Sequence, residues 1–296
     1  MKLLFIINRQ AGKNESYKLV EDQLSKHYDA EVRYTEYSGH AAVLAKEFSE
    51  KYGKNSLILA CGGDGTLNEV ICGSHGLGSV VAPVPTGSGN DFIRDFEIPR
   101  ESYLDIDSLI NGRDVEIDLI CCNDKISGNS VTVGFDCAVA KNVERFKKKR
   151  FISPGLAYKL SIFYCLFKER RHKLSVVADG RSLAADDCLL SLCAKGKYYG
   201  GGIKCAPKAS RDDGKLDFMY IPTIGVLKFI SLLPTFSKGG HIDNPKTAFI
   251  RHFKSDRVIY EADEPFEIGI DGEILTVDKA EIGVLKGAQT IRIPLG

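Results

Sequence analysis

An apolar strand that ends in a cluster of glycines around one aspartate constrains this chain more than any other feature. The apolar run at 57–61 is followed by Gly-Gly-Asp-Gly-Thr at 62–66 and then by a helix-like segment. Glycines at such a junction let the backbone turn sharply and approach a ligand closely, and the first amides of the helix attract phosphate. A carboxylate there would repel phosphate unless it bound Mg²⁺ or took part in proton transfer. The segment predicts phosphate chemistry; the alternative is a tight turn in which Asp64 caps the helix.

The first third of the chain alternates apolar strands with amphipathic helices. We expect strands at 2–7, 30–35, 56–61 and 79–84, and helices at 11–28, 40–52 and 66–72. Nearly continuous apolar strands of this kind indicate a parallel sheet covered on both faces. Ligands of such sheets bind beyond the carboxyl ends of the strands. Three polar loops leave those ends, at 8–13, 62–66 and 85–91, and they would meet at one crevice if their strands are adjacent.

Short β-type runs dominate after about residue 115. We expect strands at 114–121, 125–133, 173–177, 188–194, 216–221, 256–261, 266–270, 274–277, 280–285 and 290–293, with helices near 137–149, 156–171 and 226–237. This pattern predicts a β-sandwich with insertions. The expected fold class is therefore α/β plus all-β. A three-layer nucleotide-binding α/β domain with a parallel sheet would occupy 1–118 and a β-sandwich domain 119–285, while a strand at 286–296 would return to the first domain.

Composition limits the classes of function. The 296 residues are 44% hydrophobic and 27% charged with a formal net charge of +1, so no overall charge argues for a nucleic-acid partner. The nine cysteines include no Cys-x-x-Cys pair, and no apolar run approaches the roughly 20 residues that span a bilayer. The apolar start is too short for an export signal. We expect a cytoplasmic protein with reduced cysteines and, at most, peripheral membrane contact.

Two acidic segments in the second half each allow two interpretations. Asp213, a backbone carbonyl and Asp217 would wrap a hard cation such as Mg²⁺ or Ca²⁺, or they belong to a solvated turn. Asp271-Gly272 lies between two strand-like runs and is a strong signal for a hairpin turn. If that segment were extended instead, Asp271 and Glu273 would face the same side.

Weaker signals surround these motifs. Ser88 would donate to a phosphate, Asn90 would cap a helix, and Lys13 would hold a phosphate as a point charge, although each also fits an ordinary polar turn. Basic clusters at 145–150 and 168–173 flank an apolar, aromatic-rich stretch. Such clusters suit an anionic membrane surface; the alternative is a solvated helix face.

Taken together, these motifs resemble the diacylglycerol kinase catalytic-domain family, which includes bacterial lipid kinases and sphingosine kinases. The matching segments, spread over nearly the whole chain, are 62–69, 85–94, 200–202, 206–207, 212–217 and 271–273. The Gly-Gly-Asp-Gly motif alone is shared with NAD kinases and phosphofructokinases, whose α/β domain the first domain would resemble. The Leu-Asn-Glu continuation and the later motifs favour the lipid kinases.

The resemblance implies ATP- and Mg²⁺-dependent phosphorylation of a lipid hydroxyl, with diacylglycerol as the expected acceptor and phosphatidic acid as the product. Asp64 would organise the catalytic Mg²⁺, and Glu273 with Asp271 would accept the hydroxyl proton. Asp213, the carbonyl of Leu216 and Asp217 would hold a second, structural Mg²⁺. ATP would be surrounded by Asn8, Arg9, Gly12, Lys13, Thr35, Gly62, Gly63, Asp64, Gly65, Thr66, Asn68, Ser88 and Asn90. Arg9 departs from the family pattern, in which proline follows the asparagine.

Other acceptors stay open, namely a sphingosine-like lipid, phosphatidylglycerol or a polyprenol, because lipid selectivity depends on pocket shape. An NAD kinase fits the second-domain motifs less well. A non-catalytic nucleotide- or membrane-binding regulator is disfavoured by the joint presence of Asp64, Asp271 and Glu273. The resemblance is also compatible with a homodimer that works at the inner face of the membrane.

Overall fold

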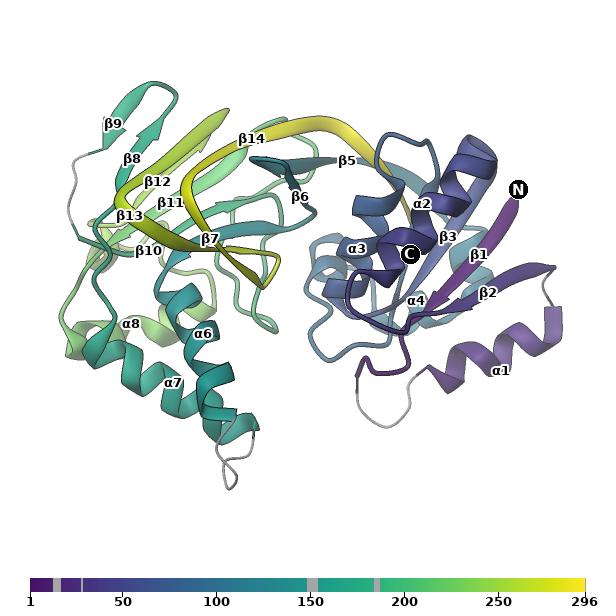
Figure 1. The fold of residues 1–296 in the computed structure, drawn as a ribbon, viewed down its shortest axis with the longest axis horizontal. Helices are drawn as coiled ribbons and strands as arrows, with labels where there is room; N and C mark the ends of the chain where they lie inside the picture. The colour runs from purple at the N-terminus through teal and green to yellow at the C-terminus, as the bar shows by residue number, and fades with distance from the viewer. Residues whose placement is uncertain (13–16, 28, 148–153, 184–186, 296) are drawn as a thin grey trace.

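The computed structural model describes residues 1–12, 17–27, 29–147, 154–183 and 187–295. They form two lobes that are connected by long strands (Figure 1). In the first lobe, four strands lie side by side in the order β2-β1-β3-β4, and all of them are parallel. Their bounds are Lys2–Ile7 (β1), Ala30–Tyr34 (β2), Ser56–Gly62 (β3) and Val80–Pro85 (β4).

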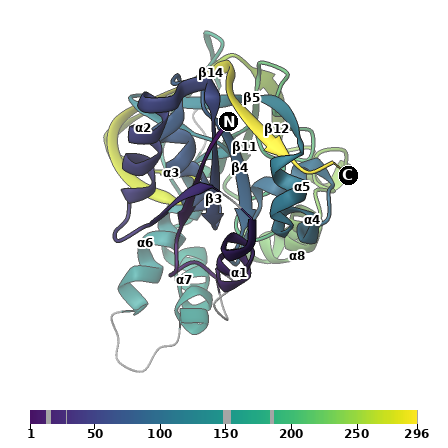
Figure 2. The same cartoon turned by 90° about the vertical axis from the view of Figure 1, so that its right-hand side faces the viewer.

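Helices cover both faces of this sheet. Figure 2 shows α2 (His40–Tyr52) and α3 (Asp64–Ser74) on one side, with α1 (Lys18–His27), α4 (Arg100–Leu104) and α5 (Ile106–Ile110) on the other. Short 3₁₀ helices occupy Gly53–Asn55 (η1) and Phe92–Phe96 (η2). Every residue of β3 and β4 is buried, which explains why these strands are continuously apolar rather than alternating.

Two antiparallel strands run from one lobe into the other. β5 (Arg113–Cys122) pairs with β14 (Glu273–Ile293) along most of its length, and the end of β14 also lies beside β4 through Ile291 and Val81. The sheet of the first lobe is therefore completed by the end of the chain.

The second lobe is a β-sandwich. Its other strands are β6 (Lys125–Ser127), β7 (Ser130–Gly134), β8 (Ser175–Ala178), β9 (Arg181–Leu183), β10 (Cys188–Ala194), β11 (Leu216–Pro222), β12 (Arg251–Ser255) and β13 (Arg257–Ile270). One half of β13 pairs with β8 and the other half with β7, with an irregularity between Glu261 and Phe266. This break lets one strand contribute to both layers. The predicted fold class, α/β followed by a β-sandwich, is confirmed.

Three longer helices flank the sandwich: α6 (Phe135–Lys147), α7 (Pro154–Lys168) and α8 (Val226–Ser237), with a 3₁₀ turn at Pro245–Thr247 (η3). Within the described residues, none of the helices is long and apolar enough to cross a membrane. The expected strand at 125–133 is split into β6 and β7, because the backbone turns at Gly128. The three strands expected within 274–293 form the single strand β14, which continues through an irregularity between Leu285 and Gln289.

Candidate functional site

Three loops meet at the carboxyl ends of β1, β3 and β4, as the sequence predicts. The backbone N–H of Gly87 donates to the carbonyl of Gly62 at 3.0 Å, which joins the second and third loops. Gly12 belongs to the first loop, has a φ of 81° and packs so closely on the carbonyl of Thr86 that a Cβ would collide with it. Only glycine fits such a position.

Polar side chains hold the first two loops together. The side-chain amide of Asn8 donates to the hydroxyl of Thr66 at 3.0 Å. Thr66 is buried and lies against Gly62, where a side chain would strike its methyl and hydroxyl groups. Close packing therefore requires glycine at 62, whereas a Cβ at Gly63 would make only an ordinary contact and one at Gly65 would meet no atom.

Asp64 begins α3 but does not cap it; Gly63 is the N-cap residue. One carboxylate oxygen of Asp64 instead accepts a hydrogen bond from the backbone N–H of Phe92 at 3.0 Å. The adjacent Asp91 accepts from the N–H of Gly201 at 2.7 Å, a contact that crosses from one lobe to the other. Burial raises the pKa of Asp91, and the negative charge of Asp64 raises it further. Asp64 and Asp91 thus place two carboxylates close enough to repel each other.

The segment at 271–273 is a hairpin turn rather than an extended strand. Asp271 and Gly272 have φ values of 47° and 89°, and Ile270 pairs with Glu273 across the turn. The carboxylate of Asp271 accepts four hydrogen bonds, from the hydroxyl of Ser127 and from the backbone N–H groups of residues 128, 129 and 130, at 2.8 to 3.2 Å. Burial nevertheless raises the pKa of Asp271. Glu273 is exposed at the start of β14.

Asn68 and Glu69, which follow the glycine loop, hold other elements in place through hydrogen bonds. The side-chain oxygen of Asn68 accepts from the N–H of Gly128 at 3.0 Å, and so connects α3 to the second lobe. Glu69 accepts from the N–H groups of Gly39 and Ala41 at 2.9 and 3.1 Å. It therefore caps the amino end of α2 from a neighbouring helix.

The remaining residues expected to surround ATP lie at the same edge of the sheet. The guanidinium of Arg9 lies 3.9 Å above the ring of Tyr34 and 2.7 Å from Glu21. The N–H of Thr35 donates to the carbonyl of Ile7. Asn90 is buried at a φ of 53° and donates to the carbonyl of Gly87. Gly65 and Ser88 are exposed, and Lys13 lies outside the described residues.

A cavity of about 480 Å³ opens beside this cluster. Asp64, Asn68 and Asp271 line its polar part, and the remaining wall is largely apolar. That wall includes Phe92 and Ile71 from the first lobe, and Val139, Ile162, Leu189, Ile203, Phe229, Leu232, Phe236, Phe249 and Ile274 from the second. The helices α6, α7 and α8 all contribute to it.

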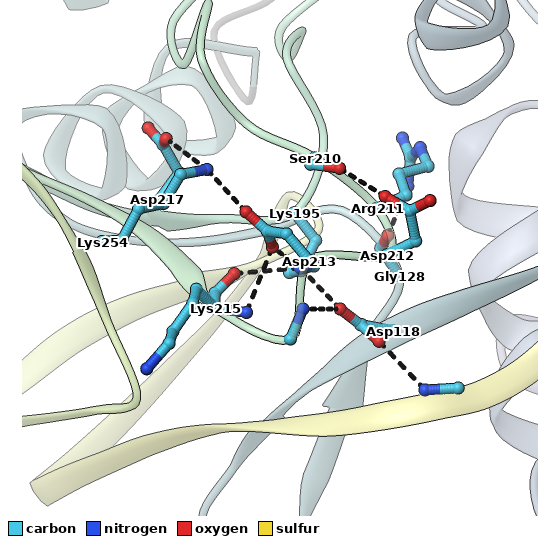
Figure 3. Close-up of polar contacts among 12 residues, drawn as sticks. Asp118, Gly128, Lys195, Ser210, Arg211, Asp212, Asp213, Lys215, Asp217 and Lys254 are labelled. Carbon is cyan, nitrogen blue, oxygen red and sulfur yellow. Dashed lines mark hydrogen bonds and ion pairs between the residues drawn. The ribbon is translucent and has the colours of Figure 1, made fainter.

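The acidic turn at 211–217 contacts lysine ammonium groups (Figure 3). Lys195 Nζ lies 2.7 Å from one oxygen of Asp213, and Lys254 Nζ lies 3.0 Å from the other. Lys254 is also 3.1 Å from Asp217, whose second oxygen is 2.7 Å from His252. Asp217 is fully buried, so a solvated turn does not describe this segment. Leu216 pairs with Ser255 in the sheet.

Sequence reasoning missed two charged residues, one in the acidic turn and one in the cavity wall. Arg211 is buried, lies 2.8 Å from Asp95, donates to the carbonyl of Gly128 at 2.8 Å and stacks on the ring of Phe92 at 3.8 Å. Asp136 lines the cavity, and burial raises its pKa to about 6. A single charge inside an apolar run was the available signal for Asp136, whereas the partners of Arg211 are distant in sequence.

Comparison with known proteins gives matches over nearly the whole chain, and they agree with the family that the sequence motifs resemble. Residues 2–122 match the family described as "Diacylglycerol kinase catalytic domain", and residues 129–291 match the "YegS C-terminal NAD kinase beta sandwich-like domain". The chain is 30% identical to a diacylglycerol kinase of Bacillus subtilis over 249 residues, which are 83% of this chain and 80% of that protein. It is 26% identical to a diacylglycerol kinase of Staphylococcus carnosus over 90% of this chain and 87% of the relative. A crystal structure of a diacylglycerol kinase from Bacillus anthracis has the same fold, with a TM-score of 0.71 at 20% identity over 98% of this chain and 96% of that one.

Proposed function

The chain belongs to the diacylglycerol kinase catalytic-domain family, and from that premise we propose that it transfers the γ-phosphoryl group of ATP to the hydroxyl of a lipid, most simply diacylglycerol. The relatives named above are diacylglycerol kinases. The product would be phosphatidic acid, and the enzyme would serve phospholipid metabolism.

The observation that carries the proposal is the cavity between the lobes. Its wall is mostly apolar, and carboxylates stand at its polar part beside the glycine loops. An acyl chain buried there would gain roughly 25 cal/mol for each Å² of apolar surface removed from water. The same cavity would hold the lipid hydroxyl near the phosphate-binding loops, and phosphoryl transfer depends mainly on such positioning and on charge neutralisation.

We place the phosphates of ATP at the junction of the three loops. Backbone N–H groups at the start of α3 would bind them, and the contact between Asn8 and Thr66 fixes two of the loops. Arg9 is held against Tyr34 and Glu21, where it would flank the nucleotide.

Asp64 and Asp91 fit a hard cation, because two neighbouring carboxylates supply the oxygen ligands that Mg²⁺ prefers. Burial is the main cause of the raised pKa of Asp91, and the negative charge of Asp64 adds to it; a cation would relieve that repulsion. Asp64 would hold the Mg²⁺ of the nucleotide, and the ion, when bound, would neutralise charge on the phosphates.

We assign the proton-accepting role to Glu273. Its carboxylate is exposed directly after the turn, and Asp271 holds that turn through four hydrogen bonds. Asp271 is therefore a positioning residue, because its oxygens already accept from four donors. A base must reach the proton that it removes, and the anchored turn keeps Glu273 beside the cavity.

The lipid would enter from a membrane surface. Phe163 and Phe167 on α7 are 64% and 54% exposed, and Leu227 on α8 is 84% exposed. Both helices also line the cavity through other residues. Exposed apolar groups next to basic residues suit peripheral contact with anionic lipid. Part of the first basic cluster, 148–150, lies outside the described residues.

The test is transfer of labelled γ-phosphate from ATP to a panel of lipids in mixed micelles, with and without Mg²⁺. Mg²⁺-dependent labelling of diacylglycerol is the expected result. Labelling of a sphingosine-like lipid, phosphatidylglycerol or a polyprenol would keep the reaction and change the acceptor. Labelling of NAD, or ATP binding without transfer to any acceptor, would overturn the proposal in favour of an NAD kinase or a regulator.

A further inference from the structure

The acidic turn of the second lobe is built like a cation site but already contains cations. Asp213 lies within it and Asp217 at its end, and Asp118 of β5 approaches from below in Figure 3. Asp118 and Asp217 are 3% and 0% exposed. Buried carboxylates need a compensating positive charge. The question is whether a metal ion or a side chain of the protein supplies that charge.

Lys195 supplies one positive charge. Its side chain is fully buried, and its ammonium group donates to Asp118 at 2.8 Å, to Asp213 at 2.7 Å and to the carbonyl of Lys215 at 2.9 Å. An ammonium has three N–H donors, and here each of them has an oxygen partner. This lysine follows directly after β10, so it is a fixed part of the sandwich.

Lys254 supplies the second positive charge, at the position between Asp213 and Asp217 where the sequence predicts a metal ion. Its ammonium group lies 3.0 Å from Asp213 and 3.1 Å from Asp217, and it donates to the carbonyl of Lys208 at 2.8 Å. Lys254 stands directly opposite Asp217 in the pairing of β11 with β12. The group therefore has two carboxylates and one carbonyl around it, which is an oxygen set that a divalent ion would also use.

We propose that the ammonium group of Lys254 is the permanent cation of this acidic turn and stands in place of a divalent metal ion, so that the turn keeps its shape without metal. Three carboxylates and two ammonium groups leave a formal charge of −1 while His252 is neutral. A divalent ion added to this set would have to displace Lys254 or lie against two ammonium groups. Among the residues that the structure describes, no cluster of three or more His, Cys, Asp or Glu side chains is arranged to hold a metal.

The turn matters because it places Arg211. That residue reaches the carbonyl of Gly128 and the carboxylate of Asp95 in the first lobe. If a lysine takes the place of the metal ion in this turn, the contacts that Arg211 makes between the lobes do not depend on the concentration of free Mg²⁺. This inference does not rest on the proposed function, since it concerns the fold without ATP or lipid.

The test compares thermal unfolding of the full chain in EDTA and in Mg²⁺, without nucleotide. We expect the wild type to melt at the same temperature in both. Lys254→Met should melt several degrees lower in EDTA, and Mg²⁺ or Ca²⁺ should restore part of the loss, because the variant removes the positive charge that Asp213 and Asp217 share. Lys254→Arg keeps the charge and should stay insensitive to metal. Lys215→Met removes an exposed partner of Asp256 from the same turn and should gain no response to metal.

A wild type that loses stability in EDTA and regains it with Mg²⁺ would overturn the proposal, and so would a Lys254→Met variant that responds to neither. If Lys254→Met does not fold, Mn²⁺ binding to Asp64→Asn decides the matter by electron paramagnetic resonance. That variant removes the carboxylate proposed for the nucleotide metal. Absence of a tightly bound Mn²⁺ ion would support the proposal that Lys254 takes the place of a metal. One bound Mn²⁺ ion per chain would contradict that proposal.

Discussion

The backbone N–H of Gly128 lies between two side chains from different lobes, 2.8 Å from a carboxylate oxygen of Asp271 and 3.0 Å from the side-chain oxygen of Asn68. One donor thus ties the hairpin turn of the sandwich to the helix that follows the glycine loop. Arg211 adds a contact to the carbonyl of the same glycine. Residue 128 is therefore where the glycine loop at 62–66 and the proposed proton acceptor are placed relative to each other.

Replacing Asp271 should loosen this junction. Asp271→Asn puts an NH₂ group where four donors now point, so at least one of those N–H or O–H groups loses its acceptor. We expect a loss of about 1–3 kcal/mol in the free energy of unfolding, measured by urea denaturation. Asp278→Asn, at an exposed position of β14, should change it by less than about 0.5 kcal/mol. Equal stability of the two variants would show that the four contacts do not hold the turn.

Glu273→Gln should separate binding from turnover. We expect ATP and lipid binding to persist while kcat falls by roughly 10²–10⁴, the range for loss of a general base. Glu281→Gln on the same strand removes an exposed partner of Arg257 and should leave kcat unchanged. An undiminished kcat for Glu273→Gln would remove Glu273 from the mechanism.

Asp136 should make stability depend on pH. Burial raises the pKa of this carboxyl from 3.8 to about 6, so the folded chain holds the proton more tightly than the unfolded chain does. The carboxyl costs no stability below about pH 4, and the cost grows as the pH rises and is complete above about pH 6. Asp136→Asn should therefore exceed the wild type in stability at pH 7–8, by up to about 3 kcal/mol.

The advantage of Asp136→Asn should vanish near pH 4. Urea denaturation at several pH values measures this, with the exposed Asp263→Asn as the matched control. A constant difference between Asp136→Asn and the wild type across the pH range would mean that Asp136 is not buried as a titrating acid.

Membrane contact should depend on α7. Replacing both Phe163 and Phe167 by serine should weaken co-sedimentation with anionic vesicles, and added salt should weaken the binding of the wild type. Tyr37→Ser removes a similarly exposed aromatic ring from the first lobe and should have no effect. Wild-type binding to neutral vesicles at every salt concentration would contradict the electrostatic part of the prediction.

The sequence predicted the parallel sheet and its three convergent loops because those features depend on local patterns. Continuous apolar strands and glycine turns are visible without tertiary information, and the Asp-Gly hairpin at 271–272 followed turn chemistry. The same local signals wrongly divided 274–293 into three strands, because β14 continues through positions that resemble turns.

The contacts that the sequence could not reveal join residues far apart in the chain. Lys254 lies 37 residues after Asp217, and only the pairing of β11 with β12 brings them together. The predicted metal set of Asp213, Leu216 and Asp217 considered oxygen ligands and omitted this lysine. The roles of the site residues, the domain limits at 118 and 285, and the homodimer stay predictions.

The completion of the first sheet by β14 has a consequence during synthesis. Domains of a growing chain usually fold in the order in which they leave the ribosome. Here β4 pairs with β3 on one side but lacks its other neighbour, β14, until the residues around Ile291 have been made. The edge of the first lobe therefore stays open while the whole sandwich is translated. An open strand edge is a template for wrong pairing. The nascent chain must therefore keep its earliest lobe unfinished, or shielded, until the residues around Ile291 have been made.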